Sequence, residues 1–159
     1  MYIFYIFAII FFILGFILKL FNNGNNDATI KYLTKSNPMT ETEQKFISYL
    51  KVFTDKYNLI ILPQVQLQSI FKTIDKKDIA SFNKIKSKSV DFAIVDNKYN
   101  YKLFIELDDY THNRKDRIKR DIFVNNLFST CNLKLKRIKV QNSYNLTELE
   151  NIIRELSSN

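Results

Sequence analysis

The hydrophobic positions divide this chain into one long apolar run and a series of shorter alternating or helical patterns. From Tyr2 to Leu18 no residue is charged, and Ile, Phe and Leu dominate. The run ends at Lys19, and a polar stretch rich in Asn follows it. A helix of about 20 residues spans the roughly 30 Å hydrocarbon core of a bilayer. The pattern therefore predicts a transmembrane helix over residues 1–21 and a linker over residues 22–36.

The flanks of this run favour a retained helix and set its orientation. A cleaved signal peptide fits less well, because no basic residue precedes the run and no small-residue cleavage site follows it. Lys19, Lys31 and Lys35 follow the run, and basic residues flank membrane helices mainly on the cytoplasmic side. The sequence thus predicts a single-pass protein of a bacterial cytoplasmic membrane, with its carboxy-terminal domain in the cytoplasm.

The pattern over residues 37–159 is typical of one mixed α/β domain. Thr40 and Glu43 have the spacing of a helix capping box, and Pro63 marks its strand as an edge strand or a bulge. Periodicity predicts the remaining elements: a strand over Leu59–Leu67, a hairpin over residues 89–109, a helix over Asn113–Thr130, a strand over Leu133–Val140 and a helix capped by Asn145. The helix over Asn113–Thr130 is expected to turn inward Ile118, Ile122, Phe123, Leu127 and Phe128.

The hairpin carries the main candidate site. A loop over Asn97–Asn100 sets the pairs Val95 with Lys102, Ala93 with Phe104, and Asp91 with Glu106. Side chains alternate faces along a strand, so Asp108 joins Asp91 and Glu106. Like charges directly opposite one another destabilise a sheet, and hard cations prefer carboxylate oxygens. The acids therefore indicate either a Mg²⁺ or Mn²⁺ site or a solvated acidic face.

Composition narrows the function classes. A single cysteine excludes an internal disulfide and a cysteine zinc cluster, and two glycines leave no Gly-rich phosphate loop. The formal net charge is +8, of which one charge, Lys19, lies in residues 1–21. Such an excess favours a polyanionic partner, nucleic acid or anionic lipid. A compositional bias toward Lys and Asn would give the same charge without a partner.

The acids belong to a longer pattern, made up of Asp91, Glu106-Leu107-Asp108-Asp109, His112, Arg120-Asp121 and Arg137. This pattern, with the order of elements, resembles the PD-(D/E)XK or restriction-endonuclease-like superfamily. Within it, the chain is similar to small bacterial domains related to the very-short-patch repair endonucleases. The resemblance covers roughly residues 33–155. It implies an α-β-β-β-α-β core with a mixed sheet.

The resemblance also implies Mg²⁺-dependent (or Mn²⁺-dependent) hydrolysis of phosphodiester bonds. Asp91 and Glu106 would be the principal metal ligands, and Asp108 stands where the superfamily usually has a catalytic Lys. His112 would then be either the proton carrier or a structural hydrogen-bonding group. Glu43 would either join Asp91, Glu106 and Asp108 around the metal or act only in the capping box.

The helix after the acids supplies candidate nucleic-acid contacts. Its basic residues would touch the phosphate backbone or form an ordinary solvated face, and they are Arg114, Lys115, Arg117 and Lys119. Arg120, Asp121 and Arg137 would support the site. For Asp121, the alternative is a surface pair with Arg117 four residues before it.

Three hypotheses about function follow. The first is a membrane-anchored, Mg²⁺-dependent nuclease that acts on DNA or RNA. The second is a nuclease-fold domain that binds nucleic acid without cutting it, because the motif Lys is absent. The third is a membrane-tethered scaffold for a protein or anionic-lipid partner.

Overall fold

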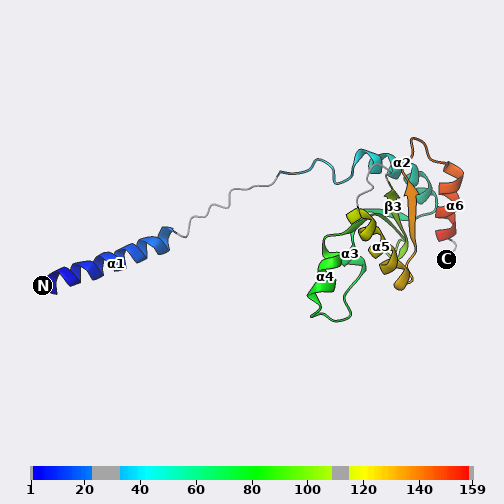
Figure 1. The fold of residues 1–159 in the computed structure, drawn as a ribbon. Helices are drawn as coiled ribbons and strands as arrows, with labels where there is room; N and C mark the ends of the chain where they lie inside the picture. The colour runs from blue at the N-terminus through cyan, green and yellow to red at the C-terminus, as the bar shows by residue number, and fades with distance from the viewer. Residues whose placement is uncertain (1, 23–32, 109–114, 158–159) are drawn as a thin grey trace. The chain divides into compact units, whose positions relative to one another are not determined.

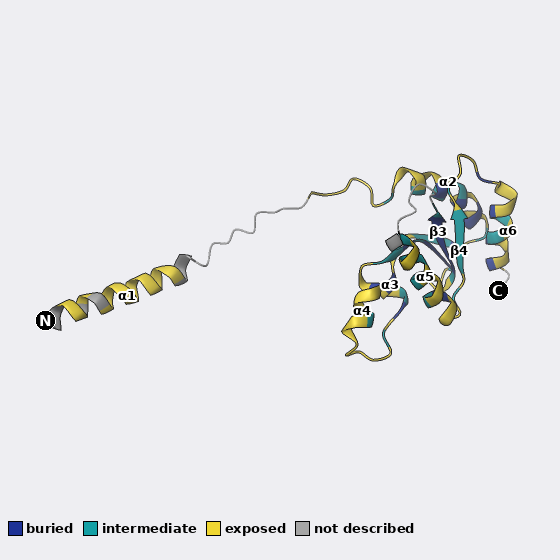
Figure 2. Cartoon of the chain, in the orientation of Figure 1, coloured by how far each residue is buried: buried dark blue, intermediate teal, exposed yellow. Residues whose placement is uncertain are grey.

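The structure is a computed structural model that describes residues 2–22, 33–108 and 115–157. The chain divides into two compact units, Met1–Ser36 and Asn37–Asn159. The described part of the first unit contains a single helix, α1 (Tyr2–Asn22). Its described side chains are exposed, as Figure 2 shows in yellow.

The prediction of a transmembrane helix is wrong. Across the helices that the structure describes, none combines the length and the apolar character needed to cross a membrane. The apolar run predicted the helix α1 itself correctly, but an apolar run does not by itself establish a helix that can span the hydrocarbon thickness of a membrane. The transmembrane helix over residues 1–21 and the location in a cytoplasmic membrane are therefore withdrawn.

The second unit contains the sheet and the remaining helices of the described chain. Its elements are α2 (Glu41–Lys56), β1 (Ile60–Gln66), α3 (Leu67–Ile70), α4 (Ile79–Lys86), β2 (Ser89–Val95), β3 (Tyr101–Asp108), α5 (Lys115–Thr130), β4 (Leu135–Lys139) and α6 (Leu146–Ser157). The sheet is four-stranded in the order β1-β2-β3-β4. β1, β2 and β3 are antiparallel neighbours, whereas β4 is parallel to β3. A parallel neighbour needs a crossover connection, which α5 provides.

The predicted mixed sheet is confirmed, and the predicted elements occur in the predicted order, with two further helices, α3 and α4, between β1 and β2. Pro63 lies in β1, which is an edge strand, as expected for a residue that cannot donate to a ladder. The capping box of α2 is present, with Thr40 as N-cap and Glu43 at the third helical position. Asn145 caps α6 by accepting hydrogen bonds from the backbone of Thr147 at 3.0 Å and Glu148 at 3.3 Å.

Two hydrophobic clusters cover the two faces of the sheet. The first joins the sheet to α2 and α6, and the second joins it to α3, α4 and α5. Figure 1 shows α2 and α6 on one side of the strands, with α3, α4 and α5 on the other. In the second cluster, Phe128 of α5 contacts Phe104 and Phe71 edge to face, with ring centroids 4.8 and 4.9 Å apart.

The hairpin register agrees with the prediction in its central part and departs from it near the turn. Ala93 pairs with Phe104, as predicted. The register shifts between Ile94 and Val95, so Val95 pairs with Tyr101 instead of Lys102. Continuing the register beyond Phe92 and Ile105 brings Asp91 opposite Glu106. The predicted meeting of these two acids is therefore retained.

Candidate functional site

The candidate site lies at the end of β2 and β3, on the face of the sheet that α5 covers. Ala93 and Phe104 turn toward α5 in the second cluster. Because side chains alternate along a strand, Asp91, Glu106 and Asp108 lie on that same face. The register of β3 with β4 adds Arg137, which pairs with Glu106. A sequence pattern spread over three strands thus comes together at one place.

Glu106 is the most buried charged side chain of the described residues. It is 4 % exposed. Burial, and next to it the charge of Asp91, raises the pKa of Glu106 to about 7, although Arg120 and Arg137 act in the opposite direction. A buried acid whose ionisation is further disfavoured by a neighbouring carboxylate is typical of functional sites.

Asp91 is held in place by the backbone of β3. Its Oδ2 accepts a hydrogen bond from the backbone N–H of Leu107 at 2.7 Å. Burial raises the pKa of Asp91, the Leu107 hydrogen bond opposes this rise, and the charge of Glu43 adds to it. The carboxylate therefore replaces a backbone acceptor just where the pairing of β2 with β3 ends.

Arg120 reaches the acids from α5. Its Nη2 donates to the backbone carbonyl of Ser89 at 3.1 Å and to Oε1 of Glu106 at 3.4 Å. Its other terminal nitrogen, Nη1, lies 3.9 Å from Oδ1 of Asp121. Arg120 thus links the helix to both strands that carry the acids.

Arg137 organises the other side of the site. Its Nη1 donates to Asp108 at 2.7 Å, its Nη2 to Asp121 at 3.3 Å and its Nε to Asn125 at 3.0 Å. These ion pairs and hydrogen bonds keep the guanidinium charged, so the pKa of Arg137 is raised even though burial lowers it. Asp121 therefore faces the site, and the alternative of a surface pair with Arg117 is wrong for the described contacts.

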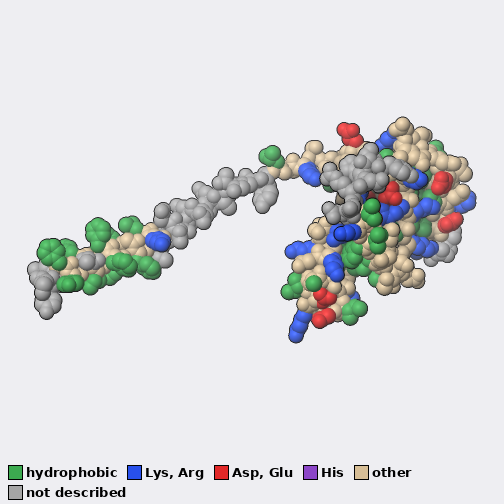
Figure 3. All heavy atoms as spheres, viewed as in Figure 1, with side chains coloured by type: hydrophobic (Ala, Val, Ile, Leu, Met, Phe, Trp, Pro, Cys, Tyr) green, Lys and Arg blue, Asp and Glu red, His purple; other side chains and the backbone are tan. Residues whose placement is uncertain are grey.

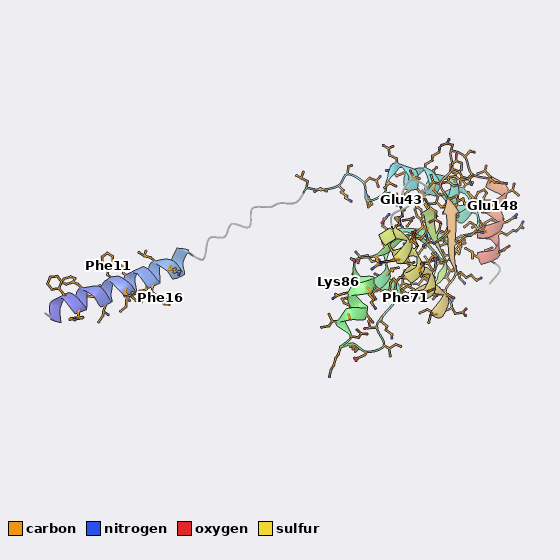
Figure 4. The ribbon with its side chains drawn as sticks, in the orientation of Figure 1. Phe11, Phe16, Glu43, Phe71, Lys86 and Glu148 are labelled. Carbon is orange, nitrogen blue, oxygen red and sulfur yellow. The ribbon has the colours of Figure 1, made fainter. Side chains whose placement is uncertain are left out.

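Glu43 caps α2, as its interpretation as a capping-box residue predicted. Its Oε2 accepts from the backbone N–H of Thr40 at 2.7 Å, and its Oε1 accepts from the side-chain amide of Gln64 at 2.9 Å. Gln64 in turn accepts a hydrogen bond from the hydroxyl of Ser89 at 3.4 Å. A polar chain therefore runs from α2 (Glu43, labelled in Figure 4) through β1 to the strand that carries Asp91.

The predicted inward face of α5 is confirmed in its second half and wrong in its first half. Phe128 is buried, and Phe123 and Leu127 are partly buried against the second cluster, as predicted. Ile118 and Ile122 were predicted to turn inward, but they are 51 % and 55 % exposed. In that first half, the face toward the site carries Arg117, Arg120 and Asp121. Helical periodicity of apolar residues cannot detect a buried face whose first two turns are charged.

Comparison with protein families gives a match. A model of a family described as a protein of unknown function, DUF2726, matches residues 35–156. The chain belongs to the DUF2726 family. No curated protein and no solved structure is similar enough to match the chain.

In the DUF2726 domain, two carboxylates of the described site could bind a cation. Among the residues that the structure describes, no three His, Cys, Asp or Glu side chains lie together in a way that could hold a metal ion. Asp108 is paired with Arg137, and Glu43 is engaged by Thr40 and Gln64. Asp91 and Glu106 remain, and Mg²⁺ is usually held by one or two carboxylates together with water and substrate phosphates. The site fits that coordination, with fewer protein ligands than the sequence predicted.

Several predicted site residues lie in or next to residues 109–114, which the structure does not describe. His112 and Arg114 fall outside the described residues, and Lys115 lies in α5 with a side chain that the structure does not describe. Arg117 is half-buried, and its charge opposes the rise that burial causes in the pKa of Asp91, whereas Lys119 is exposed. Of the predicted basic contacts, the structure therefore brings Arg117 to the acids.

Two polar residues of the DUF2726 site were missed by the sequence analysis. Asn125 holds Nε of Arg137, and Gln64 bridges Glu43 to Ser89. Gln64 has a positive φ of 52° inside a strand, and the register on either side of it puts it opposite Asp91. The sequence signal for Gln64 was its place directly after Pro63 in an edge strand, because such a position favours a local distortion of the strand backbone.

Proposed function

We propose that the DUF2726 domain is a nuclease that hydrolyses phosphodiester bonds with Mg²⁺ or Mn²⁺. The observation that carries the proposal is the Asp91–Glu106 pair, in which a carboxylate only 4 % exposed lies beside a second acid at the ends of two strands. A divalent cation would remove the repulsion between these acids, which the protein's own arginines offset only in part.

The residues of the site have distinct parts in this proposal. Asp91 and Glu106 would hold the cation, which when bound supplies an activated water and stabilises charge on the reacting phosphate. The backbone N–H of Leu107 orients Asp91, since it donates to Oδ2 at 2.7 Å. Arg137 keeps Asp108 turned toward β4 at 2.7 Å, so Asp108 has a structural part instead of the part of the missing Lys.

The resemblance to the PD-(D/E)XK superfamily supports the same proposal. The series α2-β1-β2-β3-α5-β4 has the order of elements expected for that superfamily's core, with two short helices between β1 and β2. The formal charge of +8 suits a polyanionic substrate. Figure 3 shows blue Lys and Arg side chains on the face of the domain that it presents. DNA and RNA are both compatible with these features.

The first experiment measures cleavage by the full chain. Plasmid, single-stranded DNA and RNA would be incubated with Mg²⁺ or Mn²⁺, beside the variant Glu106→Gln and the matched control Glu155→Gln. Glu155 lies exposed on α6, which packs on the opposite face of the sheet. We expect metal-dependent cutting by the wild type and the control and none by Glu106→Gln. Cutting by Glu106→Gln at the wild-type rate would overturn the proposal.

A second candidate is a nucleic-acid-binding domain without cleavage. The observation in its favour is the contact of Arg137 with Asp108, because the position that usually holds the catalytic Lys is taken up by a structural ion pair. In this case wild type and Glu106→Gln would bind oligonucleotides alike, and neither would cut. A scaffold for a protein partner would show neither cleavage nor saturable oligonucleotide binding.

A further inference from the structure

The two arginines of the site differ in how fully their nitrogens are engaged. Each of the three guanidinium nitrogens of Arg137 donates a hydrogen bond, to Asp108, Asp121 and Asn125. Its side chain is 20 % exposed. Arg137 therefore has the contacts expected of a residue that positions other side chains.

Arg120 is engaged on one side only. Both of its hydrogen bonds in the described structure use Nη2, at 3.1 Å to Ser89 and at 3.4 Å to Glu106. Nη1 lies 3.9 Å from Asp121, which is beyond hydrogen-bonding distance. The side chain is 32 % exposed, and neither of these hydrogen bonds uses Nη1.

Arg120 makes only a weak contact with Glu106. A guanidinium that pairs fully with a carboxylate forms two parallel hydrogen bonds to it, at about 2.7–2.9 Å. The structure has one contact between these two groups, from Nη2 of Arg120 to Oε1 of Glu106 at 3.4 Å. Pairing with Glu106 therefore does not account fully for an arginine in this place.

Arg120 lies where it could contact a phosphate bound beside the acid pair. Arg120 lies between β2 and β3, and Arg117, three residues before it on α5, also acts on Asp91. Residues three apart lie on the same face of a helix. A guanidinium is a permanently charged donor that suits phosphate, and Nη1 of Arg120 has two N–H groups that could donate to one.

We propose that Arg120, with Arg117 beside it, forms a phosphate-binding site for a nucleic-acid strand next to the Asp91–Glu106 pair. The inference rests on the proposed function for its substrate class. In this proposal Arg120 binds the ligand, whereas Arg137 positions other side chains of the protein. A cation on the two acids would compete with Nη2 of Arg120 for Glu106 and so leave more of the guanidinium to the phosphate.

The test measures binding and does not depend on cleavage. The affinity of the full chain for a fluorescent single-stranded oligonucleotide would be measured by anisotropy in EDTA over a series of salt concentrations. Variants would be Arg120→Gln, Arg120→Lys and the control Lys51→Gln. Lys51 is exposed on α2, which packs on the opposite face of the sheet, so the control removes the same charge away from the site.

Each phosphate contact contributes about 0.7 to the slope of log affinity against log salt for a single strand. We expect Arg120→Gln to bind more weakly at each salt concentration and to lose about 0.7 of slope. Lys51→Gln should keep the wild-type slope. Arg120→Lys should recover most of the slope, and thermal melting would show whether each variant is folded.

The outcomes separate this inference from the proposed function. An Arg120→Gln variant with the wild-type slope, or a wild type without saturable binding, would overturn the phosphate site. If Glu106→Gln abolishes cleavage while Arg120→Gln keeps the slope, the nuclease stands and the phosphate site falls. If no substrate is cut but Arg120→Gln loses slope, the phosphate site stands in a binding domain and the nuclease falls.

Discussion

At the scale of single residues, Glu106 combines burial with incomplete neutralisation. It is 4 % exposed and lies beside Asp91, and Nη2 of Arg120 lies 3.4 Å from its Oε1. An ionised carboxylate in such surroundings costs free energy, because the partners do not replace the lost water fully. The DUF2726 domain therefore keeps a destabilising acid where a functional one is proposed.

This acid gives the stability of the protein a defined pH dependence. The pKa of Glu106 is raised from 4.5 to about 7 in the folded state, so the folded protein binds the proton more tightly than the unfolded chain. The resulting stabilisation is complete below pH 4.5 and is lost as the pH rises through about 7. Over that interval the free energy of unfolding should fall by roughly 3 kcal/mol more in wild type than in Glu106→Gln.

Urea unfolding of both proteins across this pH range measures the difference. The neutral amide of Glu106→Gln removes the titration but keeps the size of the side chain, so the variant isolates the contribution of Glu106. Parallel pH profiles of the two proteins would show that Glu106 is ionised without cost. Adding Mn²⁺ near pH 7 should narrow the difference, because a cation stabilises the ionised acid.

At the scale of elements, α2 and α5 show two ways in which a helix supports the site. α2 begins with a capping box, in which Glu43 accepts from Thr40 at 2.7 Å and Thr40 accepts from the backbone of Glu43 at 3.3 Å. The second oxygen of Glu43 is tied to β1 through Gln64. The start of α2 is thus fixed both within the helix and against the edge strand.

The capping box makes a testable contribution to stability. Thr40→Ala should lower the free energy of unfolding by about 1 kcal/mol, since it leaves a backbone N–H of the first turn without an acceptor. Glu43→Gln should cost less than Glu43→Ala, because Gln also fits the third position of a capping box. Chemical denaturation measures these changes. Ser48→Ala is the control, as this exposed hydroxyl donates to Lys45 within the helix and caps nothing.

Elements with regular patterns could be predicted from the sequence, and the site could be predicted in part. The caps at Thr40 and Asn145 and the pairing of Ala93 with Phe104 follow local rules of spacing. Phe123, Leu127 and Phe128 of α5 turn inward as predicted, whereas the first half of its inward face was not predicted, because it carries Arg120 and Asp121. Local rules describe a charged position as solvated, whereas partners on other strands decide whether it turns inward.

The ligand set shows the same limit. Alternation along β3 correctly places Asp108 on the face of Asp91 and Glu106, but it says nothing about a cation from β4. Arg137 lies in parallel register beside Glu106 and draws Asp108 to itself at 2.7 Å. Such a contact depends on a tertiary pairing across α5, which no spacing along the sequence encodes.

At the scale of the whole molecule, the fold is contained in the second compact unit. Both hydrophobic clusters are built from residues between Met39 and Leu156. The two units are Met1–Ser36 and Asn37–Asn159, and α1 belongs to the first. The stability of the sheet therefore has its sources in the second unit.

Removing residues 1–36 should leave the stability of the sheet unchanged. We expect residues 37–159 alone to unfold in one cooperative transition, with the same midpoint as that of the domain in the full chain, because the truncation removes no residue of either cluster. Circular dichroism melts of both proteins provide the comparison. A truncated protein without a cooperative transition would show that the first unit contributes to the fold.

The contacts of Arg137 have a consequence for the time at which the site comes into being. A ribosome releases β2, β3 and α5 before β4, so Asp108 and Asp121 emerge before the guanidinium that joins them. Until β4 has paired with β3, the nascent chain contains Asp108 and Asp121 without the Arg137 guanidinium that joins them. The last strand of the sheet to be synthesised thus completes the site, and an unfinished chain lacks its geometry.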